Sequence, residues 1–171
     1  MIHQRTLYII RTAQKKDTIS CINLSKTSWP QWWSKNEKWG KKGIVSCIKE
    51  KQCFVVVLNH EIIGYLIFGT LYNKIHLQDI FVKEKYRREG IATKLLAKVK
   101  KFAQKKGFKE IMSDCDVSNK KSISFHLYNG FKKCGYIKKN WDDEDSYVFS
   151  KQISSIILAI SFLKAYTLIL L

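Results

Sequence analysis

Residues 79–106 read DIFVKEKYRREGIATKLLAKVKKFAQKK, and this stretch decides the fold. An apolar strand ends in a basic loop, and Gly90 then opens a long amphipathic helix. One face of that helix is apolar and lysines cover the other; the apolar face comprises Ile91, Leu95, Leu96, Val99, Phe102 and Ala103. Unpaired N–H groups at a helix start carry partial positive charge, and Arg87 and Arg88 add full charge. The junction predicts a pyrophosphate cradle, with a solvated basic loop as the alternative.

Hydrophobic periodicity on both sides of this junction predicts the other elements. We expect strands at 7–11, 53–58, 62–70, 74–82, 110–114, 131–137 and 147–152, and helices at 17–24, 90–106 and 120–129. A second helix is expected in the N-terminal part, where four tryptophans predict either a core plug or an aromatic wall of a substrate pocket. The order is β-α-α-β-β-β-α-β-α-β-β. It predicts a single α/β (α+β) domain with a mixed, mostly antiparallel central sheet.

Length and composition limit the remaining possibilities. The chain has 171 residues, is 46% hydrophobic and 26% charged, and therefore suits one globular domain, which we place at residues 7–152. The net charge of +17 favours polyanionic partners such as nucleic acid, an anionic membrane surface or a phosphorylated cofactor. The 5 cysteines are odd in number and lack metal-ligand spacing, so we expect reduced thiols, no metal and a cytoplasmic protein.

Residues 153–171 form a separate hydrophobic tail of sequence ISSIILAISFLKAYTLILL. The segment is barely long enough to span a bilayer, and Lys164 near its middle opposes insertion. One interpretation is a helix that packs on the domain or on a second copy in a homodimer. The other is a C-terminal membrane anchor, which would make the protein membrane-associated.

Two motifs resemble the GNAT acyltransferase superfamily. Arg87-x-x-Gly90-x-Ala92 is similar to the family's [Arg/Gln]-x-x-Gly-x-[Gly/Ala] motif, and Asn119 followed by Phe125 to Phe131 is similar to its Asn…Phe-Tyr-x-x-x-Gly-Phe block. The element order matches over most of the chain except the tail. The resemblance implies acetyl-CoA as cofactor and direct acyl transfer to a primary amine.

The resemblance also assigns cofactor-binding residues. The pyrophosphate would lie on the amides at the helix start, and the pantetheine arm would pair with the preceding strand end. The implied residues are Ile80, Phe81, Val82, Arg87, Arg88, Glu89, Gly90, Ile91, Ala92, Thr93 and Asn119.

Acyl transfer to an ammonium requires a proton acceptor, a donor for the leaving thiolate and an N–H where negative charge develops. The backbone near Val82 is the candidate for that N–H. His126 occupies the position of the family's usual tyrosine, so either His126 replaces that donor or the donor is absent. Asp114 ranks ahead of Asp79 as amine binder or base. Each of the three side chains could instead be purely structural.

The segment from Ser113 to Phe131 also resembles some aminoglycoside 6'-N-acetyltransferases, which carry an aspartate at the position of Asp114. Gln78 stands where those enzymes carry a glutamate, and this departure weakens the resemblance. The acidic run Asp142 to Asp145 is expected to be a turn beside the acceptor channel, where it would attract a cationic amine.

Together these features predict an acetyl-CoA-dependent N-acetyltransferase acting on a small cationic molecule or a peptide. One alternative is a non-catalytic CoA-binding or membrane-tethered regulator on the same fold. A nucleic-acid-binding module is a further alternative that the net charge suggests. The even spread of lysines along the chain disfavours that last reading.

Overall fold

The computed structural model describes residues 7–141 and 143–153. These residues divide into two compact units. Unit 1 comprises residues 7–69 and 77–98, and unit 2 comprises residues 70–76, 99–141 and 143–153. Almost all of the hydrophobic tail predicted at 153–171 lies outside the described residues.

Seven strands are hydrogen-bonded in the order β1-β2-β3-β4-β5-β7-β6, which makes a mixed sheet. The first part of the chain forms β1 (Ile9–Thr12), the 3-10 turn η1 (Lys15–Asp17), α1 (Thr18–Ser28), α2 (Pro30–Lys49), β2 (Cys53–Leu58) and β3 (Glu61–Leu71). The rest forms β4 (Lys74–Val82), η2 (Glu84–Tyr86), α3 (Ile91–Lys106), β5 (Glu110–Asp116), α4 (Lys120–Tyr128), β6 (Lys132–Trp141) and β7 (Glu144–Gln152).

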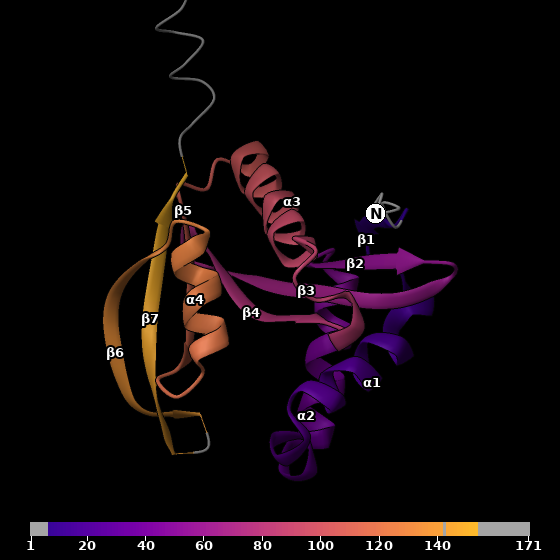
Figure 1. Cartoon of the computed structure of the whole chain (residues 1–171), viewed down its shortest axis with the longest axis horizontal. Helices are drawn as coiled ribbons and strands as arrows, with labels where there is room; N and C mark the ends of the chain where they lie inside the picture. The colour runs from indigo at the N-terminus through magenta and orange to yellow at the C-terminus, as the bar shows by residue number, and fades with distance from the viewer. Residues whose placement is uncertain (1–6, 142, 154–171) are drawn as a thin grey trace, which may run out of the picture. The chain divides into compact units, whose positions relative to one another are not determined.

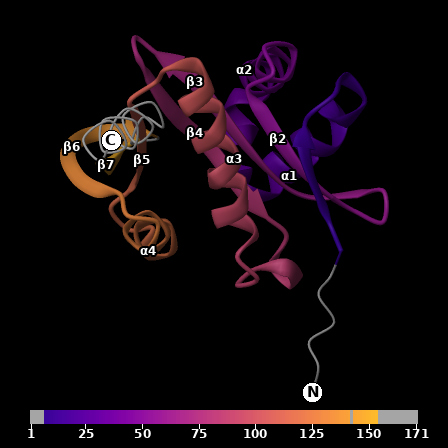
Figure 2. The same ribbon diagram turned by 90° about the horizontal axis from the view of Figure 1, so that it is seen from above.

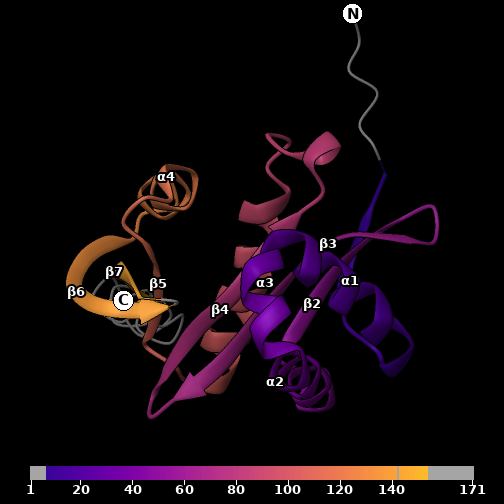
Figure 3. The same ribbon diagram turned by 90° about the horizontal axis from the view of Figure 1, so that it is seen from below.

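In unit 1, helices α1 and α2 lie on one face of strands β2 to β4 (Figure 1). The first half of α3 covers the opposite face, as the view from above shows (Figure 2). The same order of layers is visible from below (Figure 3). Both faces of β2 and β3 are therefore buried, which explains why these strands read as nearly continuous apolar runs.

The core of unit 1 lies between α1, α2 and the sheet. Tyr65 and Phe81 stack with ring centroids 6.2 Å apart, and Trp33 is 4% exposed beside them in the same cluster. Gly64 on β3 is a point of close approach, because a Cβ there would lie 2.7 Å from the carbonyl oxygen of Phe81. The core therefore fixes the β4 backbone just before the basic loop.

Unit 2 is built on β5, β7 and β6, which pair antiparallel. The side chains of β5 alternate regularly between buried and half-buried positions, so Asp114 faces away from the buried side of the strand. Helix α4 packs on β7 through His126, whose ring stacks on Phe149 with centroids 4.6 Å apart. Ile153 is buried, and its N–H donates to the carbonyl oxygen of Lys109 at 2.7 Å.

The predicted fold class is confirmed, and three local expectations need correction. The first helix was expected to end at residue 24, but α1 continues to Ser28, and α2 begins two residues later at Pro30. The acidic run is not wholly a turn, since Glu144 and Asp145 belong to β7. The tryptophans do not share one role: Trp33 is buried, whereas Trp29 and Trp39 are 40% and 71% exposed.

Candidate active site

The loop between β4 and α3 has the backbone that a cradle requires. Arg88 and Gly90 adopt positive φ angles of 70° and 74°, and residues 87–90 are exposed. Helix α3 starts at Ile91, and the N–H of Lys94 donates to the carbonyl oxygen of Gly90 at 3.0 Å. The amides from Gly90 to Thr93 therefore have no acceptor within α3.

Space and charge at this helix start suit an anion. A Cβ built on Gly90 would meet no atom of the described chain within 4 Å, so the backbone is open to a ligand. The helix dipole and the exposed guanidinium of Arg88 both favour negative charge there. The residues present fit a pyrophosphate group.

Arg87 has a different role from its neighbour. Its Nε donates to the carbonyl oxygen of Val82 at 2.8 Å, and its guanidinium lies over the Phe81 ring at 5.6 Å. Arg87 thus ties the loop to the end of β4. Its predicted contact with the cofactor stays a prediction.

Asp79 lies in a polar network between β4 and α1. The hydroxyl of Tyr65 donates to its carboxylate, the Oγ of Ser25 lies 3.4 Å from Oδ2, and the Nε1 of Trp29 lies 3.5 Å from Oδ1. Burial raises the pKa of Asp79, and burial together with the Asp79 charge raises the pKa of Tyr65. A carboxylate with a raised pKa is a better proton acceptor than an ordinary one.

A hollow of about 480 Å³ lies between the end of α1 and the basic loop of unit 1. It is lined by Leu24, Thr27, Ser28, Phe81, Lys83, Glu84 and Arg87. The hollow and the Asp79 network are built on the same elements. Ser28 of the hollow directly precedes Trp29 of the network, and Phe81 of the hollow lies on the same face of β4 as Asp79.

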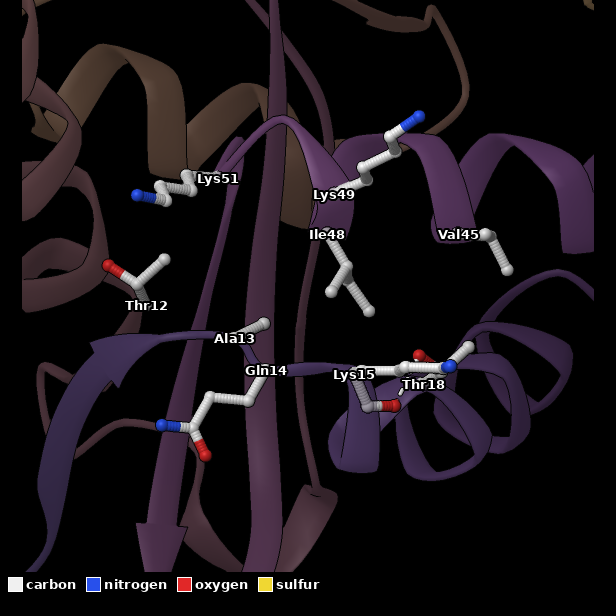
Figure 4. Close-up of a pocket in the computed structure, with 9 residues that line it drawn as sticks. All are labelled: Thr12, Ala13, Gln14, Lys15, Thr18, Val45, Ile48, Lys49 and Lys51. Atoms are coloured by element: carbon white, nitrogen blue, oxygen red, sulfur yellow. Dashed lines mark hydrogen bonds between the residues drawn. The ribbon is translucent and has the colours of Figure 1, made fainter.

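A second hollow, of about 640 Å³, lies between η1 and the end of α2 (Figure 4). Its lining includes Lys15, Lys49 and Lys51, and no carboxylate is among the lining residues. Three ammonium groups would repel a cationic acceptor. This hollow is therefore poorly suited to an amine substrate.

Unit 2 holds a cluster around Asp114 that sequence analysis did not foresee. His76 Nε2 lies 2.9 Å from Oδ1 of Asp114, while Asn140 Nδ2 and Trp141 Nε1 donate to Oδ2 at 2.9 and 2.7 Å. Although burial opposes the charged form, hydrogen bonds from His76, Trp141 and Asn140 lower the pKa of Asp114. Asp114 is therefore a stable carboxylate, and His76 is the functional candidate that the sequence analysis missed.

His126 is placed in the core of unit 2 and is 2% exposed. Its Nδ1 donates to the carbonyl oxygen of Ser122 at 2.7 Å, so the neutral ring has no hydrogen on Nε2. Burial lowers the pKa of His126, which keeps the ring neutral. This placement favours a structural role, and the predicted donor role stays a prediction.

Asn119 caps helix α4, and its Oδ1 accepts from the N–H of Ser122 at 3.0 Å. Its predicted contact with the cofactor stays a prediction. Within the acidic run, Asp145 accepts from the Tyr136 hydroxyl and from the backbone N–H of Lys139. The hydrogen bond from Tyr136 lowers the pKa of Asp145, so this carboxylate stays charged.

Within residues 7–141 and 143–153, no group of three metal-ligating side chains could hold a metal ion. None of the helices described is long and apolar enough to span a bilayer. Cys21, Cys53 and Cys115 are buried and unpaired, as expected for small core side chains.

Comparison with known proteins identifies the family to which this site belongs. Residues 19–131 match the profile of the Acetyltransferase (GNAT) family, and this range includes the cradle, His76 and Asp114. The chain belongs to the GNAT acetyltransferase family. Acetyl-CoA is the cofactor of this family, and the open amides at the start of α3 fit its pyrophosphate.

Two relatives align with very different shares of this acetyltransferase. An N-alpha-acetyltransferase of Sulfurisphaera tokodaii is 28% identical over 159 residues, which cover 84% of this chain and 92% of the relative. An aminoglycoside N(6')-acetyltransferase type 1 of Serratia marcescens is 38% identical over 55 residues, which cover only 32% of this chain and 38% of the relative.

Solved structures agree on the fold of this acetyltransferase. Ard1 from Thermoplasma volcanium superposes with a TM-score of 0.77 at 15% identity, covering 86% of this chain and 98% of that one. The PaiA N-acetyltransferase of Thermoplasma acidophilum, crystallised with coenzyme A, gives a TM-score of 0.72 at 21% identity, covering 85% and 99%.

Proposed function

We propose that this protein is an N-acetyltransferase that moves an acetyl group from acetyl-CoA to a primary amine. The observation that carries the proposal is the start of α3, where unpaired amides, an open Gly90 and the exposed Arg88 form an anion cradle. Acetyl-CoA supplies the acetyl group as a reactive thioester. Residues 7–152 constitute the proposed acetyltransferase domain.

The proposed cofactor contacts follow from the chain's own backbone. Amides of residues 88–93 bind the pyrophosphate, and Arg88 adds a forked cation. The β4 backbone of Ile80 to Val82 orients the arm of the cofactor, and an N–H near Val82 stabilises the negative charge that develops during transfer. Arg87 positions this strand end through its hydrogen bond to Val82.

The acceptor that we favour is the α-amine of a peptide. The N-alpha-acetyltransferase relative aligns over most of this chain, whereas the aminoglycoside acetyltransferase aligns over about a third. A small cationic amine is the second candidate. The shorter alignment has the higher identity, and Asp114 lies in the segment that carries the sequence resemblance to aminoglycoside acetyltransferases.

Removal of a proton from the acceptor ammonium requires a base, and two carboxylate networks are available for it. Asp79 has a raised pKa and lies beside Trp29, whose indole face suits a cation. Asp114 is held by three donors in unit 2. We propose that one of these two carboxylates acts on the acceptor amine, either by binding it or by guiding its proton.

Calorimetric titration of the full chain with acetyl-CoA and with CoA tests the cradle. We expect binding by the wild type and at least about tenfold weaker binding by Arg88→Glu, because a charged hydrogen bond contributes roughly 1.5–3 kcal/mol. Lys105→Glu makes the same charge change at the other end of α3 and should leave the affinity nearly unchanged.

A panel of peptides, polyamines and aminoglycosides then identifies the acceptor through release of free CoA thiol. Equal weakening by both charge reversals would show that the net charge binds CoA nonspecifically. Absence of CoA binding by a folded wild type would refute the proposed function.

A further inference from the structure

The hollow between η1 and the end of α2 lies wholly within unit 1. Its floor is aliphatic: the side chain of Ile48 points from α2 toward Ala13, and Val45 lies beside it (Figure 4). Ala13 and Ile48 belong to the buried core cluster of unit 1, whereas Val45 is 50% exposed. The floor therefore suits the apolar body of a ligand, which would cover Val45.

Three lysines surround this floor. Lys15 stands on the η1 side, while Lys49 and Lys51 stand on the α2 side (Figure 4). Within residues 7–141 and 143–153, none of these three ammonium groups forms an ion pair with a carboxylate. Like charges gathered around one hollow repel one another, and a bound anion relieves that repulsion. The rim therefore favours a negatively charged ligand.

The acidic side chains on the same elements do not neutralise the rim. Asp17 of η1 is buried and accepts two hydrogen bonds from Arg11 at 2.6 and 3.0 Å. On α2, Glu37 lies about three turns before the end of the helix, where it pairs with Lys41 at 3.1 Å. Glu50 caps α2, is exposed and does not line the hollow.

The backbone at Lys51 is a second, independent feature of the hollow. Helix α2 ends in a Schellman motif: the N–H of Lys51 donates to the carbonyl oxygen of Ile48 at 3.1 Å, and that of Gln52 to Cys47 at 2.8 Å. Lys51 has a φ of 58°, a left-handed conformation that glycine usually supplies in this motif. Such strained positions cluster where a ligand is held, and the ammonium of Lys51 borders the hollow.

We propose that this hollow binds a small carboxylate with an aliphatic body, at a site separate from the cradle. Its volume of about 640 Å³ is in the range of small-molecule sites. Among the described residues that line it none is aromatic, so it offers no stacking platform for a nucleic-acid base. Helices α1 and α2 lie on the sheet face opposite α3, so the ligand leaves the start of α3 free (Figure 2).

Titration of the isotope-labelled full chain with octanoate, followed by NMR, tests the proposal in the absence and in the presence of excess CoA. We expect the amide signals of Ala13, Lys15 and Lys51 to shift with one common Kd on the order of 1 mM, with or without CoA. Each CH₂ group added between hexanoate and octanoate should lower the Kd by up to about fourfold. Octanol and octylammonium should bind at least about tenfold more weakly.

A pair of charge reversals on one helix locates the anion. Lys49→Glu should raise the Kd of octanoate at least about tenfold, because a charged hydrogen bond is lost and a repulsion is added. Lys38→Glu makes the same charge change at an exposed position of α2 that does not line the hollow. It should leave the Kd nearly unchanged.

A pair of glycine substitutions separates binding from backbone strain. Lys51→Gly removes one ammonium and relieves the left-handed conformation; Lys139→Gly does the same in unit 2, where Lys139 is exposed and has a φ of 50°. Neither substitution should lower the Tm. Only Lys51→Gly should weaken octanoate binding, by about two- to fivefold.

Equal Kd values for Lys49→Glu and Lys38→Glu, or octanol binding as tight as octanoate binding, would overturn the inference. An oligouridylate that shifts these amides when octanoate does not would assign the hollow to nucleic acid instead and would overturn it as well. The inference does not rest on the proposed function: octanoate binding by a chain that binds no CoA would support the hollow and refute the acetyltransferase.

Discussion

Replacement of Gly90 by alanine tests the cradle with the smallest possible change. Gly90 has φ +74°, a conformation that costs an L-residue about 1–2 kcal/mol, and the new methyl group would project into the space open to a ligand. Gly107, at the other end of α3, offers a matched control, because its φ is +81° and a Cβ there also meets nothing within 4 Å of the described chain.

The two variants should lose similar stability. The strain of about 1–2 kcal/mol is offset in part by the lower entropy of the unfolded alanine chain, about 0.4–1 kcal/mol, so we expect a net loss near 1 kcal/mol. In a chain of 171 residues this lowers the Tm by about 2–4 °C. Thermal unfolding followed by circular dichroism measures both variants.

Only Gly90→Ala should weaken CoA binding. The methyl group prevents close approach to the amides at the start of α3, and loss of one charged hydrogen bond, roughly 1.5–3 kcal/mol, raises the Kd about 10- to 100-fold. Calorimetry of both full-chain variants gives the ratio directly. If Gly90→Ala and Gly107→Ala bound CoA with the same Kd, the assignment of the cradle to this helix start would be wrong.

Two further predictions concern buried titratable groups. Asp17 is paired with Arg11 at 2.6 Å, and the hydrogen bond from Arg11 lowers the pKa of Asp17, so its stabilisation is present above pH 4 and lost as the pH falls further. Asp17→Asn should cost about 1–3 kcal/mol at pH 7 in urea unfolding, and this difference should shrink below pH 4; a pH-independent cost would contradict the pairing. Because burial lowers the pKa of His126, the midpoint of its ring NMR titration should lie below the ordinary histidine value of about 6.5, and a midpoint at or above that value would contradict the core placement.

The elements that define the fold could be predicted from the sequence because their patterns are local. The continuous apolar run Cys53–Leu58 and the segment Lys74–Val82 were both predicted as strands with correct bounds, and the apolar face of α3 predicted that helix to within one residue. The cradle could be predicted in the same way, because the basic loop, the glycine and the helix start that form it are adjacent in the sequence. Gly90 and Arg88 therefore appeared as candidates from sequence alone.

The Asp114 cluster could not be found in the same way. His76 and Asp114 are separated by 38 positions, and Trp141 lies a further 27 positions along the chain. The Trp141 contact comes from the irregular end of β6, where the register with β7 shifts between Ile137 and Trp141. Strand alternation could have flagged His76 as the only ionisable residue between Lys74 and Asp79, but its partner is set by the tertiary structure.

The tight contact at Gly64 limits how this acetyltransferase could be diversified. Any side chain at position 64 would push on the backbone of Phe81, so a mutation there would displace the strand that leads into the loop. A library that reshapes the neighbouring hollow can vary Thr27, Ser28 and Glu84 instead. Position 64 should be kept constant in such a library, and natural drift of acceptor preference should leave it as glycine.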